Sequence, residues 1–330
     1  MKLHSGIVAR AATVAAVNGE ERGESGRAEA VLALFGPTSV GKSEVAVALA
    51  EQLAASGTGS VLIGADSMQL YEGLPLISGV ASEEQRRRAD HRLIGCVPID
   101  AEFSVAQYSK LAHAEIDGAI AAGVLPIVVG GTGLYMQAAL TEMPLRPQLS
   151  PGIEQALQAR FEAEGAEALH AELAAQAPAA ASRINVADRR RLLRALALLG
   201  EGHSIDDQAG GIWTSQMRHR TRLIGLNRER NELYERIDAR VDAIAAAGGA
   251  EEVAAALAAG ASRTAQMALG FRELPGGELQ AMKQATRRYA KRQLTWLRKL
   301  EAAELFELGG ARTAQQVAEA ILATGSPAAA

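Results

Sequence analysis

The sequence predicts an α/β protein with a P-loop-containing parallel sheet flanked by helices and an all-helical insertion domain. Three observations support this fold class. Short apolar runs without clean alternation, each followed by polar or glycine residues and then helical sequence, occur at Val31–Phe35, Val61–Ala65, Leu125–Val129 and Leu223–Leu226. A complete Gly-x-x-x-x-Gly-Lys-Ser motif follows the first run, and strand-like runs vanish between about residues 141 and 219. We therefore expect strands that are buried on both faces of the sheet, with ligand-binding sites at the carboxyl ends of the strands.

The composition of the 330-residue chain limits the classes of protein it can be. An apolar fraction of 48% is ordinary for a globular protein, and no apolar run is long enough to span a membrane. The one cysteine, Cys96, excludes an internal disulfide and a cysteine-rich zinc module. Because the formal net charge is −4, any contact with nucleic acid must come from local basic patches.

Changes in composition and in the pattern of strand-like and helical runs predict the domain boundaries. We expect a disordered extension over residues 1–29 and a loose tail over 325–330, because neither resembles a sequence that folds. The catalytic core is expected to be discontinuous, over residues 30–140 and 219–324. Residues 141–218 form the helical insertion, with helices predicted at 153–163, 166–175 and 188–199. Further long helices are predicted at 228–247 and 279–308.

The phosphate loop comprises Gly36, Pro37, Thr38, Ser39, Val40, Gly41, Lys42 and Ser43, between the first strand and an alanine-rich helix over 44–55. In that context backbone N–H groups and the helix N-terminus converge on phosphate oxygens. Lys42 adds a positive charge, and the Ser43 hydroxyl can hold Mg²⁺. The loop predicts binding of a di- or triphosphate, without deciding whether the phosphates are transferred, hydrolysed or released.

Polar residues follow the next two strands. Asp66, at the carboxyl end of the second, can bind Mg²⁺, position a substrate or act as general base beside the phosphates; alternatively it caps a helix. The third strand ends in Gly130-Gly131-Thr132-Gly133, where glycines allow close approach of a ligand and Thr132 offers a hydroxyl; alternatively this is only a tight turn. Residues 91–99 are a candidate for a further short strand.

Basic residues cluster in this otherwise acidic chain. Between Ala281 and Leu300 no acid occurs, and there are seven basic residues: Lys283, Arg287, Arg288, Lys291, Arg292, Arg298 and Lys299. Tyr289 and Trp296 are interleaved with them, which suits contact with an RNA backbone and exposed bases. The alternative is a solvated helix face with both aromatics on its buried side. A second cluster lies in the insertion, at Arg189, Arg190, Arg191 and Arg194.

With these motifs the chain closely resembles the tRNA dimethylallyltransferases, roughly over residues 31–299. The resemblance rests on the phosphate loop together with Asp-Ser-Met-Gln-Leu-Tyr (66–71), Gly-Gly-Thr-Gly-Leu-Tyr (130–135), Asp188-x-x-Arg191-x-x-Arg194-Ala-Leu, Arg230-x-x-Leu-Tyr-x-Arg236-Ile and Tyr289-Ala-Lys-Arg-Gln293-x-Thr-Trp296. Together these motifs are highly specific, whereas each alone is weak apart from the phosphate loop.

The resemblance implies transfer of the dimethylallyl group from dimethylallyl diphosphate to N6 of the adenine immediately 3′ of the anticodon, position 37 in tRNAs reading codons that begin with U. Diphosphate is released. Residues 36–43 are implied to bind the diphosphate, with Mg²⁺ at Ser43, and the catalytic residues are implied to be Asp66 as general base, Thr38 and Arg230. The implied tRNA-binding residues are Asp66, Ser67, Met68, Gln69, Thr132, Asp188, Arg191, Arg287, Arg288, Lys291 and Arg292. The implied protein is a cytoplasmic monomer, away from membranes, whose insertion grips the anticodon stem-loop.

The chain also departs from the family pattern, and other classes share some of its features. Glu154 stands where the family usually has an arginine that contacts tRNA, and Val186-Ala187-Asp188 replaces the usual Pro-Asn-Asp. A P-loop small-molecule kinase would share the loop, the acid after the second strand and a helical lid, but it would not need the acid-free basic helix. A non-catalytic RNA-binding protein with a nucleotide switch would leave Asp66 without a task.

Overall fold

The computed structural model describes residues 30–143, 149–203, 205, 216–300, 302–310 and 312–324. They fall into two compact units, of which the first ends at Met143 and resumes at Gln216, and the second is the segment between them. The insertion is predicted over 141–218, so the division falls close to both predicted ends. The predicted disordered extension, 1–29, and loose tail, 325–330, lie outside the described residues. Within the described part, no helix is both long enough and apolar enough to cross a membrane.

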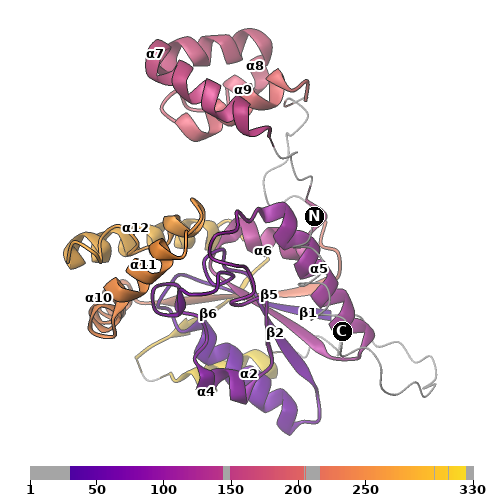
Figure 1. Ribbon diagram of the computed structural model, residues 1–330. Coiled ribbons are helices and arrows are strands. Elements are labelled where there is room, and N and C mark those ends of the chain that lie inside the picture. The colour runs from indigo at the N-terminus through magenta and orange to yellow at the C-terminus, as the bar shows by residue number, and fades with distance from the viewer. Residues whose placement is uncertain are drawn as a thin grey trace. The chain divides into compact units, whose positions relative to one another are not determined.

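The first unit contains a six-stranded sheet in which every neighbouring pair is parallel, as the sequence predicts. The strand order is β3-β2-β4-β1-β5-β6. The strands are β1 (Ala30–Phe35), β2 (Ser60–Gly64), β3 (His91–Arg92), β4 (Leu125–Gly130), β5 (Arg220–Arg228) and β6 (Glu304–Leu308). The residues of β1 from Val31 on are at most 1% exposed, because helices cover both faces of the sheet. One side carries α2 (Lys42–Ala55) and α4 (Glu83–Arg88), and the other carries α5 (Val105–Ala121) and α6 (Gly133–Leu140) (Figure 1).

The helices of the first unit follow the strands in alternation. They are α2 (Lys42–Ala55), α3 (Pro75–Ser78), α4 (Glu83–Arg88), α5 (Val105–Ala121), α6 (Gly133–Leu140), α10 (Arg230–Ala246), α11 (Gly249–Ala258), α12 (Leu279–Leu297) and α13 (Ala314–Ala323), with a 3₁₀ turn, η2, at Ala265–Met267. Strand β1 lies between β4 and β5, so the order reverses beside it. Ligands bind outside the carboxyl ends of strands at such a switch point, which is where the phosphate loop lies.

One predicted element is wrong. The helix expected over 279–308 ends at Leu297, and Glu304–Leu308 forms β6, which pairs parallel with β5. Helical pattern and basic charge continue almost to residue 300, whereas Glu304–Leu308 is a mostly exposed strand of which only Leu308 is buried, as suits the edge of the sheet. The strand expected within 91–99 is only two residues long, at His91–Arg92.

The second unit is helical, as predicted from its lack of strand-like runs. It contains α7 (Pro151–Gln176), α8 (Pro178–Ala181) and α9 (Arg189–Gly200). Gly165 interrupts α7 with φ 85°, a left-handed conformation that glycine adopts at little cost, and this break separates the two helices predicted at 153–163 and 166–175. Apolar side chains of α7 and α9 form the core of this unit, among them Leu169, Leu173, Leu192 and Leu196.

The two connections between the units leave and enter the first unit side by side. Thr141, just after α6, forms an antiparallel bridge with Met217, just before β5. The backbone N–H of Arg218 donates to the carbonyl oxygen of Leu140 at 2.9 Å. This pairing fixes the outgoing and returning chains to each other within the first unit.

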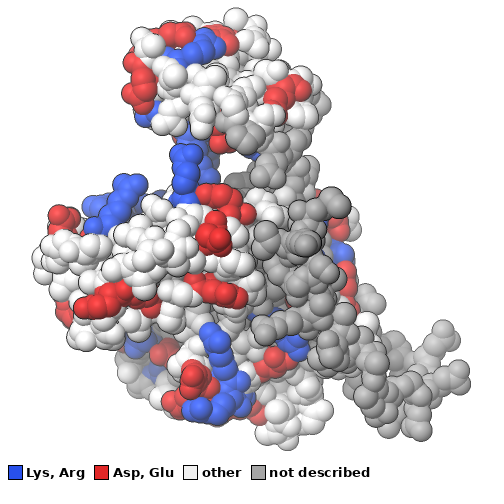
Figure 2. Space-filling model, in the orientation of Figure 1, with Lys and Arg blue, Asp and Glu red and all other residues white. Residues whose placement is uncertain are grey.

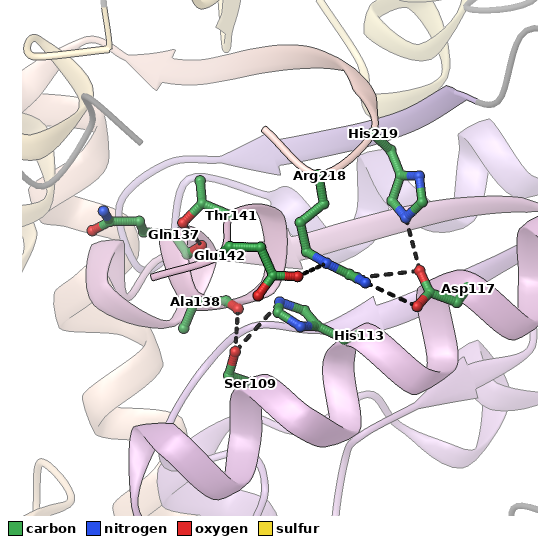
Figure 3. Close-up of polar contacts among 9 residues, drawn as sticks. All are labelled: Ser109, His113, Asp117, Gln137, Ala138, Thr141, Glu142, Arg218 and His219. Atoms are coloured by element: carbon green, nitrogen blue, oxygen red, sulfur yellow. Dashed lines mark hydrogen bonds and ion pairs between the residues drawn. The ribbon is translucent and has the colours of Figure 1, made fainter. Parts of the chain in front are cut away.

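A charged cluster, which we call the hinge clamp, ties these connections to α5 (Figure 3). The guanidinium of Arg218 donates two hydrogen bonds to the Asp117 carboxylate, at 3.1 and 3.0 Å, and one to Glu142 at 2.6 Å. His219 Nε2 lies 2.7 Å from the same Asp117 carboxylate. Asp117 belongs to α5, Glu142 to the outgoing connection and Arg218 to the returning one, so the clamp joins three segments.

Candidate active site

The phosphate loop joins the buried end of β1 to the first residue of α2. Gly41, with φ 113°, and Ser39, with φ 63°, both adopt left-handed backbone conformations. Such residues let successive N–H groups of a tight loop turn toward one point, where an anion is held together with the helix N-terminus. The Ser39 hydroxyl is buried and has no hydrogen-bond partner among the described residues. The loop therefore has the geometry of an anion cradle.

Lys42 folds over this cradle. Its ammonium donates to the carbonyl oxygens of Gly36 at 3.0 Å and Pro37 at 2.8 Å. Burial lowers the pKa of Lys42 from 10.5 to about 8, the Asp66 carboxylate opposes that shift, and the Arg240 guanidinium adds to it. Two cations and one carboxylate thus lie near each other at the loop, and an added polyanion would restore the favourable environment of the ammonium.

Three arginines from the β5–α10 segment hold the loop. Arg228 is 8% exposed and donates from Nε and Nη2 to the carbonyl oxygen of Val40 at 3.3 and 3.2 Å. Arg236 donates to the carbonyl oxygen of Ser39 at 2.9 Å. Arg240 reaches the Thr38 hydroxyl at 3.4 Å, and burial lowers the pKa of its guanidinium. Arg240 therefore has one long hydrogen bond to the described residues, and a guanidinium so placed beside a phosphate loop is suited to receive an anion.

The predicted residue Arg230 is placed differently. It is the first residue of α10, is exposed, and makes no hydrogen bond or ion pair with the loop in the part of the chain described. Sequence reasoning missed Arg240. The available signal was a cation within the apolar face of α10, one residue before Val241 and three after Ile237, both of which are buried.

Asp66 follows β2 and faces the same cations. One oxygen of its carboxylate accepts the backbone N–H of Met68 at 3.1 Å, which bends the chain back on itself after the strand. Gln69 donates to the carbonyl oxygen of Gly79 at 3.0 Å and so fixes the next part of this segment. Asp66 begins no helix, so the alternative of a helix cap is not observed. The predicted acid and phosphate loop therefore lie together at one edge of the sheet.

The turn after β4 packs directly onto the phosphate loop. A Cβ added to Gly131 would lie 2.9 Å from the carbonyl oxygen of Gly36 and would also meet the side chain of Gln293, so this position requires glycine. The Thr132 hydroxyl pairs with the Tyr289 hydroxyl at 3.1 Å. A Cβ at Gly133 would meet the ring of Trp296. Tyr289 and Trp296 of α12 therefore lie against this turn. This agrees with the alternative interpretation of the sequence, in which both aromatics lie on the buried side of the helix.

The basic residues of α12 divide into two groups. Lys283 pairs with Asp242 at 2.7 Å, and Arg287 pairs with Asp238 and stacks on Tyr234, so these two cations are neutralised by α10. Arg288, Lys291, Arg292, Arg298 and Lys299 are exposed, and none of them forms an ion pair with another described residue. In the view of Figure 2, blue side chains gather along the edge of the first unit that carries α12.

In the second unit, the predicted tRNA-binding residues lie at the start of α9. Asp188 caps that helix, accepting the backbone N–H of Arg191 at 3.1 Å, while the Arg191 side chain is 68% exposed. Arg194 lies 3.8 Å from Glu154, the residue that departs from the family pattern. The acid at 154 thus has a cation beside it within its own unit.

The donor set for a metal ion at this site is small. Ser43, in the first turn of α2, offers a hydroxyl beside the loop. In the described residues, no group of three or more His, Cys, Asp or Glu side chains is arranged to hold a metal. Mg²⁺ commonly keeps several waters and binds through one or two protein groups plus substrate phosphates. The residues present fit an ion that is held jointly with a diphosphate.

Two family models match the sequence. One, described as IPP transferase, matches residues 69–300, and another, described as isopentenyl transferase, matches residues 29–94. A protein from Thermobifida fusca (strain YX) named tRNA dimethylallyltransferase is 39% identical over 289 residues, covering 82% of this chain and 87% of that protein. A protein of the same name from Alkaliphilus oremlandii (strain OhILAs) is 35% identical over 305 residues, covering 88% and 96%.

Solved structures are similar as well. The tRNA isopentenylpyrophosphate transferase from Bacillus halodurans matches with a TM-score of 0.63 and 30% identity, covering 89% of this chain and 96% of that one. A eukaryotic dimethylallyltransferase solved while acting on tRNA matches with a TM-score of 0.69, covering 85% of this chain and 74% of that one. Its identity is 22%, so this second likeness concerns the fold alone.

Proposed function

The chain belongs to the IPP transferase family, and from that premise we propose that it transfers a dimethylallyl group from dimethylallyl diphosphate to N6 of the adenine immediately 3′ of the anticodon in tRNA. The observation that carries the proposal is the placement of Asp66 at a phosphate loop with Lys42 and Arg240, in a chain whose relatives are tRNA dimethylallyltransferases. We further propose that the substrates are tRNAs that read codons beginning with U. Because the substrate is tRNA, we place the reaction in the cytoplasm.

The loop residues 36–43 receive the diphosphate. As the allylic C–O bond breaks, negative charge grows on the leaving diphosphate, and preorganised N–H groups and cations lower the energy of that transition state. Lys42 supplies one charge from within the loop. Arg240, already beside Thr38, supplies a second, and we assign it the role that the sequence alone suggested for Arg230. Thr38 orients Arg240 through its hydroxyl.

Asp66 acts on the other substrate. Adenine N6 is a weak nucleophile because its lone pair is delocalised into the ring, so a base must accept a proton as nitrogen attacks carbon. The N6–C bond forms, the C–O bond breaks, the N6 proton passes to the Asp66 carboxylate, and diphosphate departs. The other oxygen of the Asp66 carboxylate, for which the described residues supply no hydrogen-bond donor, is available for this step.

The adenine must leave the anticodon loop to reach this carboxylate, which requires flipping it out of its stack. The exposed cations of α12 and the outward Arg191 are suited to the phosphates of the anticodon stem-loop. Thr132, whose hydroxyl contacts Tyr289, lies on the turn beside the acceptor segment. We assign these residues to tRNA binding, and Lys283 and Arg287, with their acidic partners, to the packing of α12 on α10.

Mg²⁺ would be held by the Ser43 hydroxyl and diphosphate oxygens, and it would supply further neutralisation of the leaving group. The chain's own residues still bind and orient both substrates and hold the proton. A small-molecule kinase, the rival with the same loop, finds no support among the family models that match.

The test is to mix the purified protein with dimethylallyl diphosphate and unmodified tRNA and to measure inorganic pyrophosphate. We expect release that depends on both substrates. A kinase would instead form ADP from ATP and would release no pyrophosphate from the allylic substrate. Pyrophosphate release without any gain of mass by the tRNA would contradict the proposal, because it would indicate hydrolysis.

A further inference from the structure

Helix α12 has a second face besides its basic one. Tyr289, Gln293 and Trp296 lie four and three residues apart, so they share one side of the helix. That side meets the turn after β4: the Tyr289 hydroxyl pairs with Thr132, and Trp296 lies against Gly133. Between the two aromatics, Gln293 is 3% exposed and therefore lies inside the protein rather than on an RNA-facing surface.

Gln293 joins the two loops that border the candidate active site. Its Oε1 accepts the backbone N–H of Thr38 at 2.8 Å, and its Nε2 donates to the carbonyl oxygen of Gly131 at 2.7 Å. Thr38 belongs to the phosphate loop after β1, whereas Gly131 belongs to the turn after β4. One side chain from a third element therefore sets how these two loops meet.

A primary amide is suited to this task because it carries an acceptor and a donor on the same planar group. A carboxylate could accept from Thr38 but would repel the Gly131 carbonyl, and an ammonium could only donate. An apolar side chain of equal length would leave a buried N–H and a buried C=O without partners. The absence of a Cβ at Gly131 leaves the room in which Nε2 lies.

We propose that Gln293 is a positioning residue that fixes the separation between the loop holding the diphosphate and the turn beside the acceptor base. The inference rests on the proposed function, in which the allylic carbon is carried by the first loop and meets N6 from the side of the second. Reacting atoms must approach to about 3–3.5 Å, and a displacement of about 1 Å can cost about 100-fold in rate. Gln293 touches neither reacting group and acts through the backbones of Thr38 and Gly131.

The experiment compares three variants with the wild-type full-length protein. Gln293→Met keeps the length of the side chain and removes both hydrogen bonds. Gln293→Glu is nearly isosteric, and only its protonated form has both a donor and an acceptor. Gln137→Met is the matched control: Gln137 is 2% exposed, lies on α6, and its Oε1 has no partner among the described residues.

We expect Gln293→Met to lower kcat about 100-fold while the KM values for diphosphate and tRNA change by less than about threefold, since binding groups are retained. Gln137→Met should match the wild type. The activity of Gln293→Glu relative to Gln293→Met should rise as pH falls, because burial favours the neutral carboxyl at position 293. Taking this ratio cancels any pH dependence that the two variants share. An unchanged kcat in Gln293→Met, or a ratio that does not vary with pH, would overturn the proposal.

Amide hydrogen exchange of the phosphate loop, without substrates, tests the same geometry separately from the reaction. The Thr38 amide should exchange faster in Gln293→Met than in the wild type or Gln137→Met, because it has lost its acceptor. Equal exchange in all three would contradict the role of Gln293. A wild-type protein that transfers nothing would refute the proposed function instead, and the exchange result would still decide whether Gln293 holds the loop.

Discussion

Replacing Lys42 by methionine should make the protein without ligand more stable at neutral pH, although it removes a residue needed for diphosphate binding. Burial lowers the pKa of Lys42 from 10.5 to about 8. At about 1.36 kcal/mol per pKa unit, that difference corresponds to about 3.4 kcal/mol against the charged form in the folded state. Methionine would leave the Gly36 and Pro37 carbonyl oxygens without their donor, at about 1 kcal/mol each, so we expect a net gain of about 1–2 kcal/mol.

The same shift sets the direction of a pH dependence. Between about pH 8 and pH 10.5 the unfolded chain holds a proton on Lys42 that the folded chain releases, so stability rises with pH across this window. Below about pH 8 both states are protonated and the penalty is fully present. Lys42 is expected to contribute a gain of about 2.5 kcal/mol to the unfolding free energy of the wild type from pH 7 to pH 10, and this contribution should be absent from Lys42→Met.

Urea unfolding at intervals from pH 7 to pH 10, followed by circular dichroism, measures this difference. Subtracting the Lys42→Met curve from the wild-type curve cancels groups common to both, including Cys96, whose pKa burial raises to about 11. Lys110→Met, at an exposed position of α5, controls for the loss of one positive charge. Saturating pyrophosphate should flatten the wild-type curve, since a bound polyanion favours the charged ammonium. Parallel curves for wild type and Lys42→Met without ligand would refute the reasoning.

Three further outcomes follow from the contacts described. Arg240→Ala should raise KM for the allylic diphosphate and lower kcat, whereas Arg230→Ala, at an exposed position, should change neither. Steady-state kinetics in which only Arg230→Ala had an effect would return the role at the diphosphate from Arg240 to Arg230. Neutralising the exposed cations of α12 together should flatten the dependence of log Kd for tRNA on log salt by about 0.7–0.9 per lost phosphate contact, and an unchanged slope would exclude this helix from the interface. Arg218→Met breaks the hinge clamp. It should lower the free energy of unfolding by only about 1–2 kcal/mol, because both acidic partners of Arg218 are partly solvated. It should also raise KM for tRNA but not for the diphosphate. Equal effects on both KM values would show that the clamp supports the core instead.

Much of the fold could be predicted because the local signals agree. Strand β1 precedes the phosphate loop, β2 precedes Asp66 and β4 precedes Thr132. These three strands are buried on both faces and therefore consist mainly of apolar residues, which predicts strands that pair in parallel. In a parallel sheet the residues that follow the strands meet at one edge. Strand β6 was missed because an edge strand on one side of the sheet has a short, half-solvated pattern, and five residues of it cannot be separated from the end of a basic helix.

The site was less predictable than the fold because it depends on contacts between distant elements. Arg230 and Arg240 are both cations of one helix, and only the packing of that helix decides which one reaches Thr38. The cations of α12 look alike in sequence, yet Lys283 and Arg287 are neutralised by acids on α10. Gln293 lies far along the chain from both loops that it joins, so no local pattern reports its role.

The measurement that bears most directly on the central claim is single-turnover transfer by the wild type and by Asp66→Asn. Each protein is used in excess over unmodified tRNA at a saturating concentration of dimethylallyl diphosphate, and the digested nucleosides are followed by mass spectrometry. The wild type should convert one adenosine per tRNA, next to the anticodon, to the form in which dimethylallyl replaces a hydrogen. Asp66→Asn should bind both substrates but form this product about 10²–10⁴-fold more slowly, because it has lost the group that accepts the N6 proton. Equal rates in the two proteins, or no modified adenosine from the wild type, would contradict the claim that this protein transfers a dimethylallyl group to tRNA with Asp66 as the base.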